Sequence, residues 1–225
     1  MLLNASEISS RLVSDLRLGL PVILYDGEQI VLAAAIETLC SEKLEKINEI
    51  TNSKKFEIAI TNRRAKVLNA RVYNEAVTRL SIKEKIDMHL LHAIADPSKD
   101  LDYPLKGPFQ SERDGNFEIA SLSLSLCKKA RLLPASILVN ITKNARRKMV
   151  SAQISECDIN YLKIKSESTT FLPTLSSAQL PIDGQKNISL TVFRELTDLT
   201  EHYAIVFGKP KNNQPVLTRV HSACF

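Results

Sequence analysis

Two kinds of hydrophobic periodicity alternate along the first 150 residues, and this alternation restricts the folds that the chain can adopt. From Ser6, the expected N-cap, to Gly19, apolar residues recur every three or four positions, which is the period of a helix. Residues 22–25 and 30–35 are apolar runs joined by Asp26-Gly27, a pair typical of a β-hairpin. Further helices are expected around residues 44–50, 65–72, 82–94 and 116–131, and further strands around 56–60 and 137–141. The pattern predicts an α+β fold with an α/β sandwich.

Near residue 150 the helical periodicity ends. Only strand-like runs follow, at 188–193, 203–207 and 216–220, separated by Gly, Asn and Pro turns. We therefore expect a first domain over 1–150, a linker over 151–175 and a short β-rich segment over 176–225. A segment of about 50 residues buries too little surface for a robust core of its own. It is expected to rest on the first domain or on another chain.

Composition excludes several classes of protein. With 44% hydrophobic residues in 225, the chain can bury a real core, which argues against disorder. The net charge of +5 is spread along the chain, and the basic runs lack interleaved aromatics, so nucleic-acid binding is not expected. No apolar run approaches the roughly 18 residues of a membrane span, and no leader is evident. We expect a cytoplasmic protein with no membrane partner and with reduced, widely spaced thiols: Cys40, Cys127, Cys157 and Cys224.

Two weaker signals are expected to be ordinary surface features. His89 and His92 have the spacing of metal ligands on a helix, but no Glu or Cys accompanies them. Arg63-Arg64, Lys128-Lys129 and the basic run at 146–148 are typical of solvated faces.

The last fifty residues contain the sharpest motif. On spacing alone, Arg219, Val220, His221 and Ser222 form an amphipathic edge strand, and one Arg, one His and one Cys do not make a zinc site. However, Ala178-Gln179-Leu180-Pro181, then the run at 202–208, then residues 215–224 resemble in order the opening of GTP cyclohydrolase II. That family opens the imidazole ring of GTP in riboflavin synthesis, releases formate and pyrophosphate, and holds a zinc ion with three cysteines.

The resemblance implies roles for particular residues. Arg219, Val220, His221 and Ser222 would contact the nucleotide, and Cys224 would be the first zinc ligand. Ala223 stands where the commoner form of the motif has Glu. The other two cysteines would lie after position 225, so we expect a truncated chain with no bound zinc and no turnover.

The first 150 residues resemble 3,4-dihydroxy-2-butanone 4-phosphate synthase, the enzyme fused before the cyclohydrolase in many bacteria, which acts on ribulose 5-phosphate with magnesium. The motifs that carry the resemblance are the runs at 19–23, 32–35, 96–108, 113–120 and 132–135. The acidic loop of the family is reduced here to 26–29, and neutral residues replace further ligands. Magnesium prefers several carboxylate oxygens, so we expect a degenerate site made of Asp26, Glu28, Asn116, Glu118 and Asn140.

The sequence therefore predicts a riboflavin-pathway protein of the GTP cyclohydrolase II type that is not catalytic as these 225 residues. The alternative is a non-catalytic scaffold derived from the synthase, which dimerises or positions a cyclohydrolase. A third hypothesis keeps residual sugar-phosphate binding in the first domain.

Overall fold

The computed structural model describes residues 4–27, 29–51, 55–82, 87–115, 117–163, 172–182, 187–195, 200–211 and 213–221. The chain divides into two compact units, Met1–Glu167 and Ser168–Phe225, and each is described by itself. Among the helices of the described residues, none is both long enough and apolar enough to cross a membrane.

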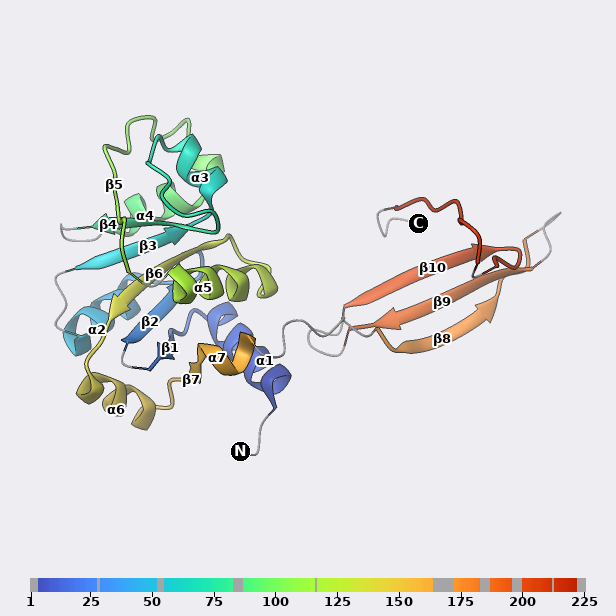
Figure 1. The fold of residues 1–225 in the computed structure, drawn as a ribbon, viewed down its shortest axis with the longest axis horizontal. Helices are drawn as coiled ribbons and strands as arrows, with labels where there is room; N and C mark the ends of the chain where they lie inside the picture. The colour runs from blue at the N-terminus through green and yellow to red at the C-terminus, as the bar shows by residue number, and fades with distance from the viewer. Residues whose placement is uncertain are drawn as a thin grey trace. The chain divides into compact units, whose positions relative to one another are not determined.

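A mixed sheet forms the centre of the first unit (Figure 1). Over the described residues its strand order is β5-β4-β3-β6-β2-β1-β7, and neighbours are antiparallel except β1 and β7, which are parallel. The predicted hairpin is confirmed as β1 and β2, which pair around Gly27. The strands are β1 (Val22–Asp26), β2 (Gln29–Ala35), β3 (Phe56–Ile60), β4 (Thr78–Ile82), β5 (Gln110–Ser111), β6 (Ala135–Asn140) and β7 (Glu156–Asp158).

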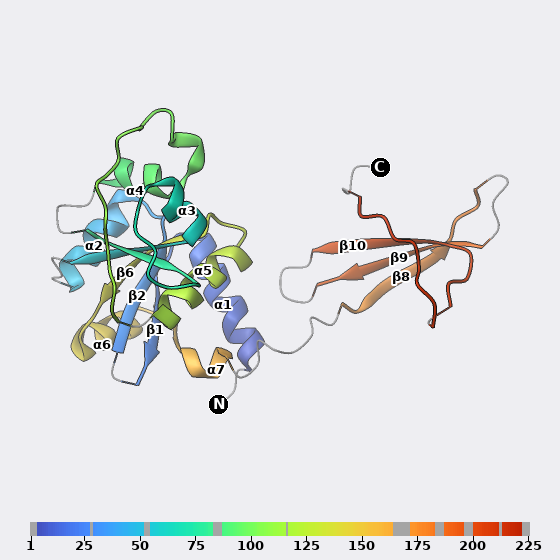
Figure 2. The same ribbon diagram turned by 45° about the horizontal axis from the view of Figure 1, so that its top comes forward.

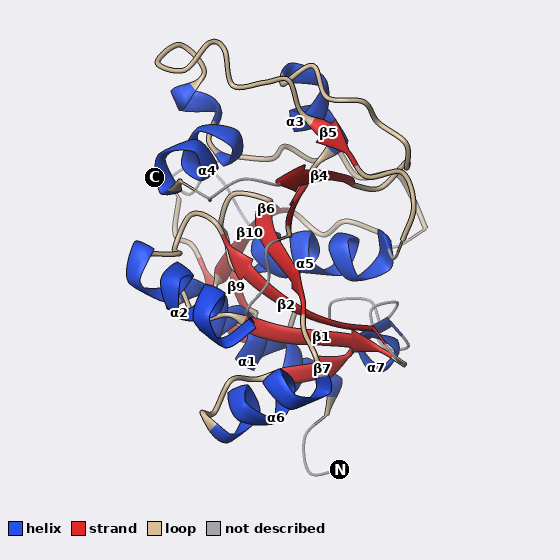
Figure 3. Ribbon diagram, turned by 90° about the vertical axis from the view of Figure 1, so that its left-hand side faces the viewer, coloured by secondary structure: helices blue, strands red, loops and turns tan. Residues whose placement is uncertain are grey.

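Helices cover both faces of this sheet, because successive strand residues point to opposite sides and both sides are apolar. Ile58 and Leu32 pack in one core with the helices α2 (Ser41–Thr51), α3 (Asn62–Val67), α4 (Met88–Ala95) and α6 (Lys143–Ser151). Ala59 and Ala33 pack in a second core with α1 (Ala5–Arg17), α5 (Phe117–Lys129) and α7 (Ile159–Lys163). Figure 3 shows α2 and α6 against the strands of this sheet. A short 3-10 helix, η1 (Pro97–Lys99), follows α4.

The N-cap of the first helix lies two residues before the predicted one. Asn4 caps α1 in place of Ser6, because its side chain accepts a hydrogen bond from the Glu7 backbone while the Glu7 carboxylate accepts one from the Asn4 backbone. Gly19 follows the helix end with φ +68°, and a Cβ there would lie 2.2 Å from the Thr38 carbonyl oxygen. Only glycine fits this close approach.

The helix expected over 82–94 is wrong in its first part. Ile82 ends strand β4, which pairs with β3 along its whole length, and the helix begins only at Met88. Ile86 lies outside the described residues. The helix expected near 65–72 also ends early, at Val67. Asn69 adopts φ +54°, a left-handed conformation that commonly ends helices.

The first unit continues beyond the predicted boundary at residue 150. β7 pairs with β1, and Ile159 and Leu162 of α7 are buried in the second core. Up to residue 163, the segment predicted as a linker over 151–175 is thus ordered structure of the first unit. The sequence also missed α6, because its buried face consists of only Ala145 and Met149.

The described part of the second unit is a three-stranded antiparallel sheet (Figure 2). It contains β8 (Thr174–Gln179), β9 (Ile188–Arg194) and β10 (Glu201–Phe207), in the order β10-β9-β8. The predicted strands at 188–193 and 203–207 are confirmed, whereas 216–220 forms no strand. Val220 is 93% exposed, so no partner strand orders this segment within the described residues. The predicted fold class, α+β followed by a short β-rich segment, is confirmed.

Candidate functional site

A small crevice lies in the first unit where α5 covers β2, β3, β4 and β6. Its volume is about 10 Å³, and its lining residues are Gln29, Val31, Glu57, Arg79, Ile119, Leu138 and Asn140. Asn140 is a residue of the predicted synthase site, and Gln29 at the start of β2 donates a hydrogen bond to its side-chain oxygen at 3.3 Å. The crevice is therefore the place to test the predicted degenerate site.

Arg79 and Glu57 form a buried ion pair in this crevice. They lie on the paired strands β4 and β3, on the sheet face that α5 covers, and Arg79 Nη1 is 2.9 Å from Glu57 Oε2. Only 4% of Arg79 is exposed. A buried charge is costly unless it is paired and hydrogen-bonded, so each of the two residues provides the partner that the other needs.

Further contacts hold the Arg79 guanidinium in place. Its Nη2 donates to the Asp114 carbonyl oxygen, and its central carbon lies 4.5 Å from the centroid of the Phe117 ring. Gly115 adopts φ +105°, a conformation that favours glycine, and a Cβ there would lie 2.8 Å from Nη2. The motif at 113–120, which carries the synthase resemblance, thus folds around an arginine.

A second ion pair extends this cluster toward β5. Lys55 Nζ lies 2.9 Å from Glu112 Oε1, and the hydrogen bond from Lys55 lowers the pKa of the Glu112 carboxyl below its usual range. The same hydrogen bond raises the pKa of Lys55. The carboxylates of this part of the sheet are therefore engaged by cationic side chains.

The structure brings together few of the predicted synthase residues. Of the predicted residues that the structure describes, Asn140 alone lines the crevice. Asp26 accepts a hydrogen bond from Asn160 Nδ2 at 3.0 Å, and Glu118 is exposed in the first turn of α5. Glu28 and Asn116 lie outside the described residues.

The described residues of the crevice do not fit a magnesium ion. Magnesium requires near-octahedral oxygen ligands, usually with one or two carboxylates. In the crevice, the Glu57 carboxylate is paired with Arg79 and the Asn140 side-chain oxygen accepts from Gln29. Among the described residues, no three His, Cys, Asp or Glu side chains are grouped to hold a metal.

The residues predicted to contact a nucleotide lie at the end of the second unit. Arg219, Val220 and His221 are exposed in a segment without regular structure, while Ser222 and Cys224 lie outside the described residues. The zinc prediction for Cys224 is therefore untested. The described residues do not fit zinc either, because they contain no group of three possible ligands.

The cysteines of the first unit differ in reactivity. Burial raises the pKa of the Cys127 thiol to about 12 and that of Cys157 to about 11, whereas Cys40 is exposed. Since the thiolate is the nucleophile, we expect iodoacetamide at pH 8 to alkylate Cys40 and to leave Cys127 and Cys157 unmodified in the native protein. Peptide mass spectrometry of the Cys224→Ser variant checks this, with the urea-unfolded protein as the control. Native labelling of Cys127 at the rate of Cys40 would contradict it.

The first unit also contains a larger groove, which sequence reasoning missed. The residues from two segments, 67–73 and 100–111, line it, and its volume is about 830 Å³. Its signal in the sequence was the Pro-, Gly- and Asp-rich passage at 97–115, a length of loop that is often functional.

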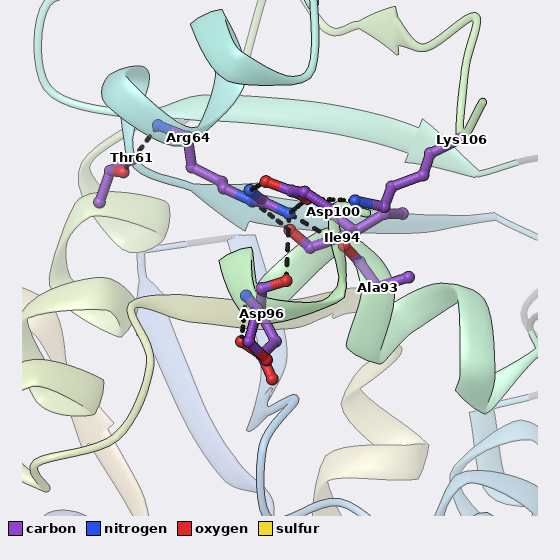
Figure 4. A network of polar contacts seen from close by, with 8 residues as sticks. Thr61, Arg64, Ala93, Ile94, Asp96, Asp100 and Lys106 are labelled. Atoms are coloured by element: carbon purple, nitrogen blue, oxygen red, sulfur yellow. Dashed lines mark hydrogen bonds and ion pairs between the residues drawn. The ribbon is translucent and has the colours of Figure 1, made fainter. Parts of the chain in front are cut away.

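Arg64 fixes the base of this groove (Figure 4). Its guanidinium donates to the Ile94 carbonyl oxygen at 2.7 Å and to the Ala93 carbonyl oxygen at 2.9 Å. It also forms a bidentate ion pair with the Asp100 carboxylate, with N–O distances of 2.6 and 2.7 Å, and Lys106 contacts the same carboxylate. The loop that begins at η1 is thereby tied to α3 and α4.

The Arg64 and Asp100 pair predicts an acid dependence of stability. Hydrogen bonds from Arg64 hold the pKa of the Asp100 carboxyl well below its ordinary value of 3.8. A carboxyl with a lowered folded-state pKa contributes stability above its unfolded pKa and loses it as the pH falls toward the folded value. We expect the Tm of the wild type to fall between pH 5 and pH 2.5 by more than that of Asp100→Asn, measured by circular dichroism. Parallel curves for the two proteins would contradict this.

Solved structures define the class of the first unit. The chain is similar to a two-domain 3,4-dihydroxy-2-butanone 4-phosphate synthase from A. baumannii, with 17% identity and a TM-score of 0.53, over 91% of this chain and 71% of that one. A 3,4-dihydroxy-2-butanone 4-phosphate synthase of Candida albicans matches with 15% identity and a TM-score of 0.50, over 68% of this chain and 94% of that one. The first unit has the fold of this synthase.

Sequence comparison defines the second unit. Residues 174–225 match the family model of GTP cyclohydrolase II. The chain is 29% identical over 230 residues to the GTP cyclohydrolase-2 of Azospirillum brasilense, covering 98% of this chain and 58% of that protein. The predicted relationship, a synthase-like domain followed by the opening of a GTP cyclohydrolase II domain, is confirmed. The chain spans 58% of the length of that relative.

Proposed function

We propose that the chain is a riboflavin-pathway protein of the GTP cyclohydrolase II type, in which the synthase-like unit is a non-catalytic scaffold. The observation that carries the scaffold role is the buried Arg79 and Glu57 pair in the crevice beside Asn140. A guanidinium held by a carboxylate, a carbonyl oxygen and an aromatic ring repels a divalent cation and leaves no carboxylate for it.

The size of the crevice supports the same proposal. Small-molecule sites have volumes of about 300–1,000 Å³, whereas this crevice measures about 10 Å³, room for one water at most. A sugar phosphate does not fit there without removal of the Arg79 side chain. This argues against residual binding of ribulose 5-phosphate at this place.

The second unit would supply nucleotide contacts. An arginine at 219 suits a phosphate group, because its planar guanidinium donates two parallel hydrogen bonds, and His221 and Ser222 offer further donors. In the family, a zinc ion held by three cysteines supplies the Lewis acid for ring opening. These 225 residues carry one cysteine at the matching place, Cys224, and a single thiolate does not hold a catalytic zinc.

Two assays test the proposal. The purified 225-residue chain, supplied with GTP and zinc, is expected to release no formate, and with ribulose 5-phosphate and magnesium no formate and no butanone phosphate. The Azospirillum brasilense protein and the Candida albicans synthase serve as positive controls for the respective reactions. Formate release from ribulose 5-phosphate by this chain would overturn the scaffold role. Formate release from GTP would overturn the proposal that the second unit is inactive.

The scaffold role also implies association with another chain. A domain without catalytic activity contributes by binding other protein chains. We propose that the synthase-like unit forms a homodimer. Sedimentation equilibrium on the 225-residue chain is expected to give twice the mass of 25.1 kDa. A monomer at micromolar concentrations would overturn this.

A further inference from the structure

The groove near Arg64 is separate from the crevice described above. The two share no lining residue, and the groove's volume of about 830 Å³ falls within the range of small-molecule sites. One wall comes from the end of α3 and the residues after it, 67–73. The other comes from the loop 100–111, which Arg64 ties down through Asp100. The groove is therefore a formed concavity with an anchored base.

Aromatic rings line the groove. Tyr73, Tyr103 and Phe109 come from both walls, and Pro104 and Pro108 add flat apolar surface. The Arg113 guanidinium carbon lies 5.8 Å from the centroid of the Tyr73 ring and braces it from outside the groove. Aromatic rings in such positions stack on planar ligands.

The charges of the groove favour an anion. Arg71 lines the groove and is exposed, and over the described part of the chain its guanidinium makes no hydrogen bond or ion pair. The carboxylate of Asp100 is already paired with Arg64 and Lys106, so it does not neutralise the positive charge of Arg71. A phosphate group is the anion that a guanidinium binds best, through two parallel hydrogen bonds.

Polar side chains near the aromatic rings can form hydrogen bonds with the edge of a heterocycle. The side chains of Asn69 and Gln110 both donate and accept, and both line the groove. Ser111 also lines it, and among the described residues its buried hydroxyl has no hydrogen-bond partner. Buried hydroxyls are normally hydrogen-bonded, so the Ser111 hydroxyl is an unsatisfied hydrogen-bonding group beside the groove.

We propose that this groove binds a phosphorylated heteroaromatic molecule of mononucleotide size, with the ring between the tyrosines and the phosphate on Arg71. A second copy of the chain is the rival occupant, because Leu105 at the rim is 94% exposed. The unpaired Arg71 and the buried hydroxyl of Ser111 favour the small molecule, since an apolar contact between copies would leave both unsatisfied.

Titration of the full 225-residue chain tests this proposal. Adenosine 5′-monophosphate, adenosine and inorganic phosphate serve as probes in calorimetry and in two-dimensional NMR. We expect the monophosphate to bind with a Kd below 1 mM, on the order of a weak natural ligand, and to shift amide signals of residues 67–73 and 103–111. Adenosine and phosphate alone should each bind at least tenfold more weakly.

Matched variants locate the site. Arg71→Ala is expected to weaken binding of adenosine 5′-monophosphate at least tenfold, and Tyr73→Leu to weaken it without changing the preference for the phosphorylated probe. Arg63→Ala removes an exposed arginine of the same helix region outside the groove and should leave the Kd unchanged. Arg219→Ala separates the groove from the proposed nucleotide contacts of the second unit and should also have no effect.

If no probe shifts the signals of 67–73 and 103–111 at 5 mM, or if Arg219→Ala abolishes binding and Arg71→Ala does not, the proposal is wrong. If Arg71→Ala or Leu105→Ser instead changes the sedimentation of the chain while probe binding is absent, the groove is a surface between copies. The proposed scaffold role does not depend on any of these results.

Discussion

Replacing Arg64 by alanine is expected to lower the free energy of unfolding by about 2–5 kcal/mol, because each buried carbonyl oxygen left without its donor costs about 1–3 kcal/mol. The change leaves the Ala93 and Ile94 carbonyl oxygens without a donor and removes the two-pronged contact to Asp100. It also frees the loop that lines the groove. Urea unfolding followed by circular dichroism measures the loss.

Two further variants make this prediction specific. Arg64→Lys keeps the charge but not the planar fork, so we expect it to recover less than half of the lost stability. Arg63→Ala, beside it on α3, removes an exposed arginine and should change stability by no more than about 0.5 kcal/mol. An Arg64→Ala protein as stable as Arg63→Ala would show that the network in Figure 4 contributes nothing.

The second large effect is expected at the crevice. Glu57→Leu should cost about 3–5 kcal/mol, because it leaves the Arg79 guanidinium buried and without its carboxylate. Adding Arg79→Met to Glu57→Leu should restore most of that loss, since an apolar pair of similar volume is often as stable as a buried ion pair. The coupling between the two sites is obtained from a double-mutant cycle in urea.

Lys55→Ala provides the control for this cycle. Lys55 lies on the same edge of the sheet, but 56% of its side chain is exposed, so its pairs with Glu57 and Glu112 contribute little. We expect a loss within about 1 kcal/mol. Strictly additive effects of Glu57→Leu and Arg79→Met would mean that the two charges do not stabilise each other.

The sequence predicted the likeness to known families but not the contacts within the candidate site. The order of motifs in 1–150 and 178–224 predicted the likeness to both families, because short runs such as 113–120 keep their order even where identity is low. The same motif did not reveal that Arg79, more than thirty positions upstream, lies against Phe117 and Asp114. That contact depends on the pairing of β4 with β3, and the sequence did not predict β4, whose last residue, Ile82, was assigned to the start of a helix.

The groove was beyond sequence reasoning for a related reason. Its walls are separated in the chain by residues 74–99, and no periodic pattern marks loops. Arg64 looked like part of a solvated basic run, yet it is 8% exposed because the ends of α4 and η1 fold over it.

Local periodicity and turn chemistry by themselves determined the alternation of helices and strands, the β1 and β2 hairpin and the change to a β-rich segment. These features depend on neighbours within a few residues, which is the range over which apolar spacing acts. Only the tertiary structure decided the end of the first unit after β7 and α7, the burial of Arg64 and Arg79, and the irregular course of 216–220. Each of these depends on partners far away along the chain, because a strand forms where another strand pairs with it and an arginine is buried where carbonyl and carboxylate oxygens converge on it.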